Sequence, residues 1–297
     1  MIRLAHVADV HLGARLSGLP DYPGCPDIDA TQAAYDAFDA LLTRLIDGRY
    51  DAVLLAGDLF DRHETGPRAL AAARSALTAL HDAGIPVALG WGNHDAESPL
   101  PARLRLPPSC WVAPDEAPAS CSWPDLGTVV HAQSISAANQ SRDLAVNYPA
   151  SQPDSINIGM LHTSLTGEHS RRPCAPTTSQ ALVDHGYDYW ALGHVHHRMR
   201  VRDTIAYPGS THPARPRELG PRGFLELRCG DTITVTAIDT APVVRELLTA
   251  DTEADIEQRF AAYAAPEHPV VWTLAGPAEL LGPAREIARS YPGFAVA

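Results

Sequence analysis

Residues 52–58 read AVLLAGD, five apolar residues followed at once by a glycine and an aspartate. A short apolar run that ends at a turn signal is typical of a strand buried on both faces. Open α/β sheets place their functional groups beyond the carboxyl ends of such strands. The stretch therefore predicts an α/β fold with Asp58 at the functional edge of its sheet.

Similar strands are predicted on both sides of this stretch. Residues 2–8 alternate apolar and small side chains and lead into Asp9. Residues 85–89 form a further apolar run and lead into a turn that reads GWGNHD at 90–95. Each predicted strand thus ends at polar side chains, and these should gather at one edge of a parallel sheet.

Two helices are predicted between these strands. Residues 33–46 carry apolar side chains at helical spacing. Residues 68–83 lie between Pro67 and Gly84, which are typical of a helix start and a helix end. The alternation of strands with helices indicates that the strands run parallel.

The second half of the chain is richer in β structure. A short helix is predicted within 178–186, and strands within 110–135, 156–161, 188–192, 198–207, 223–228 and 232–238. We therefore expect residues 1–240 to form a four-layer β-sandwich of the α/β (α+β) class, with two sheets face to face and helices outside.

Residues 241–297 are predicted to form a separate unit. Their pattern is β-α-β-α-β, over 243–248, 253–264, 270–274, 278–290 and 294–296. This segment holds eight acidic residues and four arginines. A small, cap-like and truncated α/β domain of acidic character is expected.

The composition is that of a soluble globular protein. Of 297 residues, 45% are hydrophobic and 20% are charged. No apolar run reaches the ~18 residues that a membrane span needs. The five cysteines are scattered without a CxxC pair, which favours a reduced cytoplasmic protein and argues against a zinc ribbon.

The charge distribution is uneven. The formal net charge of −12 argues against a protein that coats DNA by bulk electrostatics. The chain has no lysine, however, and nine arginines against six acidic residues lie between His162 and Arg228. Arginine suits phosphate well, so Arg171, Arg198 and Arg200 are candidate substrate contacts. The alternative is a solvated rim in a protein whose genome favours arginine over lysine.

Residues of metal-ligand type follow the predicted strands. They are Asp9, His11, Asp58, Asn93, His162, His194 and His196. Mixed carboxylate, imidazole and amide ligands suit Mn²⁺, Fe²⁺ or Zn²⁺. Two such ions about 3.5–4 Å apart are the usual arrangement for in-line displacement at phosphorus. The sequence therefore predicts a two-metal, phosphoester-hydrolysing site.

Each motif alone has an ordinary structural explanation. Asp58 could cap the following turn, Asp61 and Arg62 could form a surface ion pair, and His162 could be a structural core histidine. Structural roles do not require every motif to follow a predicted strand, however. The joint pattern therefore favours one shared site.

The pattern resembles the calcineurin-like metallophosphoesterase superfamily, and within it the SbcD/YhaO-type DNA-repair exonucleases. The narrower resemblance is carried by LHT at 161–163 and by DYWALGHVH at 188–196. It extends through AYPGS at 206–210 and GPRG at 220–223. The resemblance covers residues 2 to about 240.

The resemblance implies a role for each candidate ligand. Asp58 would bridge the two ions. One ion would also be held by Asp9, His11 and His196, and the other by Asn93, His162 and His194. The family pattern further implies manganese as the metal and attack of water at phosphorus in line, with His94 donating a proton to the leaving oxygen.

Asp61 departs from the nuclease pattern. Archaeal and eukaryotic relatives tend to carry histidine three residues after the bridging aspartate, whereas Asp61-Arg62 looks like the phosphoprotein-phosphatase version. By that resemblance Asp61 would orient His94 and favour its charged form. Arg62 would bind a phosphate oxygen or form a structural ion pair.

Three functions are therefore weighed. The first is a two-metal nuclease that acts on DNA ends or single strands, with an SMC-like ATPase partner implied by resemblance. Related nucleases form dimers through helices near the site, and the Ala-rich helix 68–83 could pack internally or against a second copy. SbcD-type chains usually run longer, which puts the ATPase-binding segment in doubt. The second is a phosphodiesterase or phosphatase for a small phosphorylated molecule, favoured by the negative charge. The third is a non-catalytic, metal-binding scaffold for the ATPase.

Overall fold

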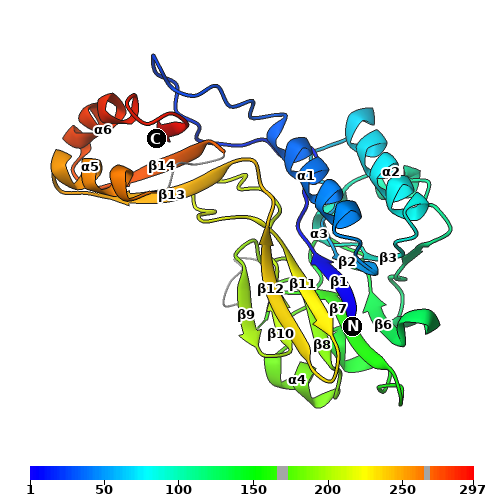
Figure 1. The fold of residues 1–297 in the computed structure, drawn as a ribbon. Helices are drawn as coiled ribbons and strands as arrows, with labels where there is room; N and C mark the ends of the chain where they lie inside the picture. Colours follow the sequence, from blue (N-terminus) through cyan, green and yellow to red (C-terminus); the bar gives the residue numbers. More distant parts are fainter. Residues whose placement is uncertain (166–172, 264–267) are drawn as a thin grey trace.

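A computed structural model describes residues 1–165, 173–263 and 268–297. Within these residues two six-stranded sheets lie face to face, and a three-stranded sheet forms a smaller unit near the C-terminus (Figure 1). Helices pack outside the two large sheets, so the predicted α/β sandwich is confirmed. No helix of this described part is long and apolar enough to cross a membrane.

The first sheet carries the predicted parallel strands. Its order is β12-β11-β1-β2-β3-β4. Strands β1 to β4 run parallel, whereas β11 and β12 form an antiparallel hairpin beside β1. The bounds are Ile2–Val7 (β1), Ala52–Ala56 (β2), Val87–Gly90 (β3), Cys110–Val112 (β4), Gly223–Cys229 (β11) and Ile233–Asp239 (β12).

Strand β2 is buried on both faces, as its apolar run predicts. Val53 and Leu55 point to helices α1 (Ala33–Asp47) and α2 (Pro67–Asp82), with which they share one core. Leu54 points the other way, into the core between the two sheets. The alternation follows from the two-residue period of a strand.

The second sheet completes the sandwich. Its order is β5-β6-β7-β8-β10-β9. The bounds are Ala119–Trp123 (β5), Thr128–Gln133 (β6), Ile156–His162 (β7), Tyr189–Gly193 (β8), Met199–Arg202 (β9) and Ile205–Tyr207 (β10). Helix α4 (Ser179–Asp184) covers its outer face, where Leu182 packs with Trp190 and Leu192.

The two sheets approach closely at their carboxyl ends. A Cβ added to Gly193, the last residue of β8, would lie 1.9 Å from the carbonyl oxygen of Ala56 at the end of β2. Only glycine fits at that point. The absence of a side chain there lets the loop after β8 lie beside the loop after β2, and the two loops carry His194 and Asp58.

The small unit follows the predicted β-α-β-α-β order. Its strands run parallel in the order β13-β14-β15, and its own core contains Phe260, Trp272 and Phe294. The bounds are Val244–Thr249 (β13), Glu253–Ala262 (α5), Val270–Ala275 (β14), Leu281–Ala288 (α6) and Phe294–Val296 (β15). The domain boundary at residue 240 stays a prediction.

A buried arginine joins this unit to the sandwich. Arg245 of β13 is fully buried, and its guanidinium donates to the carbonyl oxygens of Pro213 at 2.9 Å and Ser17 at 2.6 Å. The segment between β1 and α1 reaches the unit (Figure 1), and Leu16 packs there with Val271. Two loops of the sandwich thus meet one side chain of the small unit.

The structure adds one element where the sequence predicted only a turn. Residues Asn93–Glu97 form a short helix, α3. Asp95 caps it, because its carboxylate accepts a hydrogen bond from the Gly92 backbone N–H at 2.9 Å. The turn is therefore a capped helix start.

A buried carboxylate joins β11 to β1. Glu226 is 2% exposed and accepts hydrogen bonds from Arg3 Nη2 at 2.6 Å, Tyr50 Oη at 2.7 Å and Arg228 Nε at 2.5 Å. Burial would raise the pKa of Glu226, but these hydrogen bonds outweigh burial and lower the pKa to about 2.

Glu226→Gln is expected to lower the free energy of unfolding by about 2 kcal/mol at pH 7, because charged hydrogen bonds are lost. The folded pKa of about 2 lies below the ordinary 4.5, so the stabilisation is complete above pH 4.5 and is lost as the pH falls toward 2. Urea unfolding across this range measures it, with exposed Glu279→Gln as control. A difference from wild type that stays constant down to pH 2 would contradict the linkage.

Candidate metal centre

The site begins at two adjacent turns of unusual backbone conformation. The loops after β1 and β2 run side by side, with His11 N donating to Asp58 O at 2.9 Å. The φ angles of Asp9, His11 and Asp58 are 52°, 47° and 54°. This left-handed region is disfavoured for side chains other than glycine, and such residues gather at functional sites. The turns aim the side chains away from the strands.

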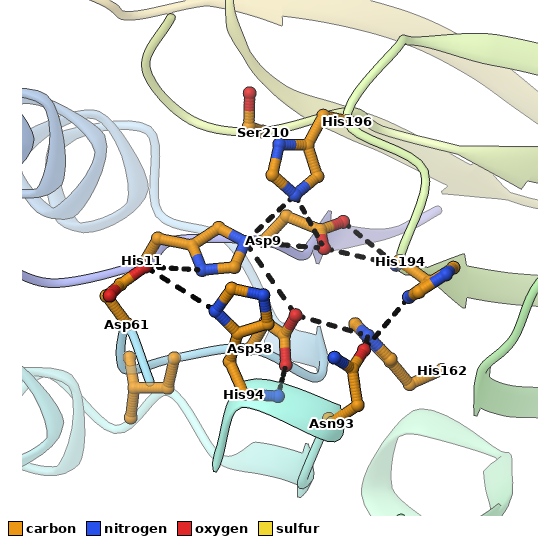
Figure 2. A network of polar contacts seen from close by, with 12 residues as sticks. Asp9, His11, Asp58, Asp61, Asn93, His94, His162, His194, His196 and Ser210 are labelled. Atoms are coloured by element: carbon orange, nitrogen blue, oxygen red, sulfur yellow. Dashed lines mark hydrogen bonds and ion pairs between the residues drawn. The ribbon is translucent and has the colours of Figure 1, made fainter. Parts of the chain in front are cut away.

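The structure brings all seven predicted metal ligands into one cluster (Figure 2). They come from the loops after β1, β2 and β8, from α3, and from the end of β7. Most are buried, and Asp9 and Asp58 are 0% and 1% exposed. The set is Asp9, His11, Asp58, Asn93, His162, His194 and His196.

Asp58 lies between two groups of side chains. Its Oδ2 is 3.7 Å from His11 Nε2 on one side and 3.3 Å from His162 Nε2 on the other. On the first side His11 Nε2 lies 3.0 Å from His196 Nε2. On the second side Asn93 Oδ1 lies 3.1 Å from His162 Nε2. This is the placement that a bridging carboxylate requires.

The donor set fits divalent cations. Several groups of three residues each have ligand atoms that all lie within 4.8 Å of one another. Asp9, His11 and His196 form one of these groups. His162 Nδ1 donates to Ala56 O at 2.9 Å, which leaves Nε2 to face Asp58. Such a contact behind a histidine is how proteins orient a metal-binding imidazole.

Burial and the nearby carboxylates shift the pKa values of the clustered imidazoles in opposite directions. Burial would lower the pKa of His162, but the charge of Asp58 outweighs it and raises the pKa to about 9. Burial lowers the pKa of His194 to about 3 and that of His11 well below its ordinary value. These two imidazoles are thus neutral near pH 7, as metal binding requires.

His94 lies against the carboxylate of Asp58. Its backbone N–H donates to Asp58 Oδ1 at 2.8 Å. Its ring Nδ1 lies 3.4 Å from Asp61 Oδ2 and 3.4 Å from the Arg62 backbone nitrogen. Burial would raise the pKa of Asp61, but its hydrogen bonds with His94 and the His63 backbone outweigh burial and lower the pKa. The contact is the one predicted for Asp61, although its catalytic role stays a prediction.

The structure shows two supporting carboxylates that the sequence did not assign. Glu218 Oε1 accepts from His196 Nδ1 at 2.6 Å, and its Oε2 accepts from the Arg215 backbone N–H at 3.0 Å. Asp95 accepts from the backbone N–H groups of Leu59 and Phe60 at 3.1 and 2.9 Å. Asp95 stands in the quoted GWGNHD motif, whereas nothing in the sequence marks Glu218.

A cleft of about 1110 Å³ lies over the cluster. Its lining includes Asp58, Asn93, His94 and His194, and its arginines among the described residues are Arg62, Arg215 and Arg217. Arg62 Nη1 also pairs with Glu97 at 3.0 Å.

The predicted arginine contacts stay predictions, and the structure places Arg198 and Arg200 beside acidic residues. Arg198 pairs with Asp239 at 2.6 Å, and Arg200 lies 3.4 Å from Asp203. Neither lines the described part of the cleft. Arg198 lies before β9 and is half-buried, with its Nε donating to Pro208 O at 3.3 Å, whereas Arg200 of β9 is exposed. Arg171 lies outside the described residues.

Comparisons with known proteins agree with this geometry. A family model described as calcineurin-like phosphoesterase matches residues 2–198. The uncharacterized metallophosphoesterase YhaO of Bacillus subtilis is 28% identical over 74% of this chain and 55% of its own length. The DNA double-strand break repair protein Mre11 of Aeropyrum pernix is 31% identical over 75% of this chain and 56% of its own. The chain thus spans little more than half of these relatives.

Among solved structures, a dimetal phosphatase from Danio rerio aligns with a TM-score of 0.48 and 11% identity. The alignment covers 80% of this chain and 99% of that one.

Glu218→Gln is expected to lower Mn²⁺ affinity by about 10–100-fold, because such partners orient the ligand and raise its basicity. Calorimetric titration of the variant against wild type measures this, with exposed Glu116→Gln as the control. Equal affinities in all three proteins would show that His196 needs no carboxylate behind it.

Proposed function

We propose that this chain, a phosphoester hydrolase that belongs to the calcineurin-like phosphoesterase family, is a two-metal phosphodiesterase acting on DNA ends or single strands. The observation that carries this proposal is the position of Asp58 between two ligand groups, with His94 against it. The relatives named for DNA double-strand break repair support DNA as the substrate. They match over about half of their own length.

Two divalent ions, proposed as Mn²⁺ with Fe²⁺ or Zn²⁺ as alternatives, would supply the charge that activates water and neutralises the phosphoryl oxygens. Asp58 would contact both. The first position would be completed by Asp9, His11 and His196, and the second by Asn93, His162 and His194.

His94 is the proposed proton donor. Its backbone contact with Asp58 fixes it beside the reacting group, and Asp61 at 3.4 Å from its Nδ1 would stabilise the charged ring. With Nδ1–H directed at Asp61, the proton that reaches the leaving oxygen would come from Nε2. The ring would keep Nδ1–H, and with it the contact to Asp61, before and after the transfer.

The cleft supports a polymeric substrate. Its volume of about 1110 Å³ exceeds the roughly 300–1,000 Å³ typical of small-molecule pockets. Arg215 and Arg217 are exposed on its wall, where they can contact phosphates on either side of the scissile bond. These local charges can attract DNA despite the net charge of −12.

A small phosphorylated substrate is the second candidate. The Asp61-Arg62 pair favours it. The ion pair between Arg62 and Glu97 also favours it, because Glu97 places a negative charge next to Arg62 that would repel a long polyanion. A non-catalytic scaffold is disfavoured, because it would not need His94 beside Asp58. A homodimer and an SMC-like ATPase partner stay proposals that rest on the sequence resemblance.

With Mn²⁺, wild-type protein is expected to degrade linear DNA, and Asp58→Asn to lose this activity because a neutral amide cannot bridge two cations. His94→Ala is expected to keep its metal and to lose about 10²–10⁴-fold in kcat, the usual contribution of a positioned acid. Gel assays and metal analysis of each variant provide the measurement. Cleavage of bis-p-nitrophenyl phosphate without cleavage of DNA or RNA would leave a phosphodiesterase and remove the nuclease.

The Arg215→Ala, Arg217→Ala double variant is expected to bind single-stranded DNA more weakly, with a log–log salt slope smaller by about 1.4. Arg200→Ala is the matched control, since Arg200 lies outside the described cleft lining. Fluorescence anisotropy at several salt concentrations measures both. If Arg200→Ala weakened binding as much as the double variant did, the proposed DNA path would be wrong.

A further inference from the structure

A buried thiol lies beside the second metal position and has no part in the mechanism above. Cys174 is 1% exposed. Its Sγ and one ring nitrogen each of His162 and His194 all lie within 4.8 Å of one another. Cys174 also contributes to the cleft lining. Two imidazoles and a thiol that converge in this way form a set of potential metal ligands.

Backbone hydrogen bonds hold the thiol in this position. Cys174 N donates to Ser164 Oγ at 2.9 Å, and Ser164 N donates to Cys174 O at 2.8 Å. On the next residue, Thr163 Oγ1 donates to Ala175 O at 2.7 Å. The loop is thereby tied to the chain directly after β7, whose last residue is His162. The positions of the sulfur and of the imidazole are therefore coupled.

The separations suit a single ion. Zinc–sulfur bonds are about 2.3 Å and zinc–nitrogen bonds about 2.1 Å, so sulfur and nitrogen ligands of one tetrahedral ion lie about 3.6 Å apart. The group observed here spans at most 4.8 Å. Side-chain shifts of about 1 Å or less would bring all three atoms to bonding distance of one ion. The thiol would give up only a weak contact, from Sγ to the His162 carbonyl oxygen at 3.7 Å.

We propose that Cys174 is a sulfur ligand of the ion held by His162 and His194, and that it makes this position selective for Zn²⁺ or Fe²⁺ over Mn²⁺. Sulfur favours such softer ions, whereas the position of Asp9, His11 and His196 offers only oxygen and nitrogen. On binding, the S–H bond breaks, the proton leaves to solvent and a sulfur–metal bond forms. The inference rests on the proposed two-metal function and predicts two chemically different ions in one site.

Cobalt substitution tests the inference without an activity readout. Wild-type protein loaded with Co²⁺ is expected to show near-ultraviolet thiolate-to-metal charge-transfer absorption together with visible d–d bands. Cys174→Ser should lose the charge-transfer band and keep the d–d bands. Cys121→Ser is the matched control, because Cys121 lies on β5 and belongs to none of the ligand groups among the described residues. It should keep both.

A charge-transfer band that persists in Cys174→Ser would overturn the inference. Absence of any Co²⁺ spectrum in wild type would instead remove the metal centre, and the proposed function with it. X-ray absorption on wild-type protein with one equivalent of Zn²⁺ needs no variant, so a folding defect cannot obscure the answer. A sulfur shell at about 2.3 Å supports the inference, and a shell of nitrogen and oxygen alone overturns it.

Discussion

The buried carboxylate of Asp58 is the contact on which the rest of the site depends. One of its oxygens accepts from the backbone of His94, and the other faces His11 and His162. It therefore joins the loops that follow β1, β2 and β3 to the end of β7. The fit is tight, since a Cβ added to Gly92 would lie 2.2 Å from Asp58 Oδ1. The close approach of these segments and of the loop after β8, rather than any single motif, creates the site.

Much of this arrangement follows from the sequence because it depends on regular structure. Apolar runs such as 52–56 fix the strands, and the carboxyl ends of parallel strands must meet at one edge. The candidate ligands could therefore be brought together before any coordinates were known. The prediction of a turn at Asn93 is incomplete, because the helix that forms there depends on the hydrogen bond between the Asp95 carboxylate and the Gly92 backbone N–H.

Features that depend on irregular loops, or on which face of a strand a side chain occupies, could not be predicted in this way. Glu218 reaches His196 from a loop without a motif, so only the folded chain shows the contact. The arginines of 198–202 cluster in sequence, yet Arg200 alternates with Met199 and Val201, which pack inward. A count of charged residues in the sequence does not show which way each side chain points. The position of Cys174 beside His162 and His194 likewise depends on tertiary contacts, such as its backbone hydrogen bond to Ser164, and could not be predicted from the sequence.

The buried guanidinium of Arg245 has a mechanical consequence for the cleft. It holds the carbonyl oxygens of Ser17 and Pro213, and Ser17 lines the cleft wall. A displacement of the small C-terminal unit would therefore act on this wall through the Arg245 guanidinium. The entrance of the cleft is thus mechanically coupled to the small unit through Ser17, a residue outside the set of candidate metal ligands.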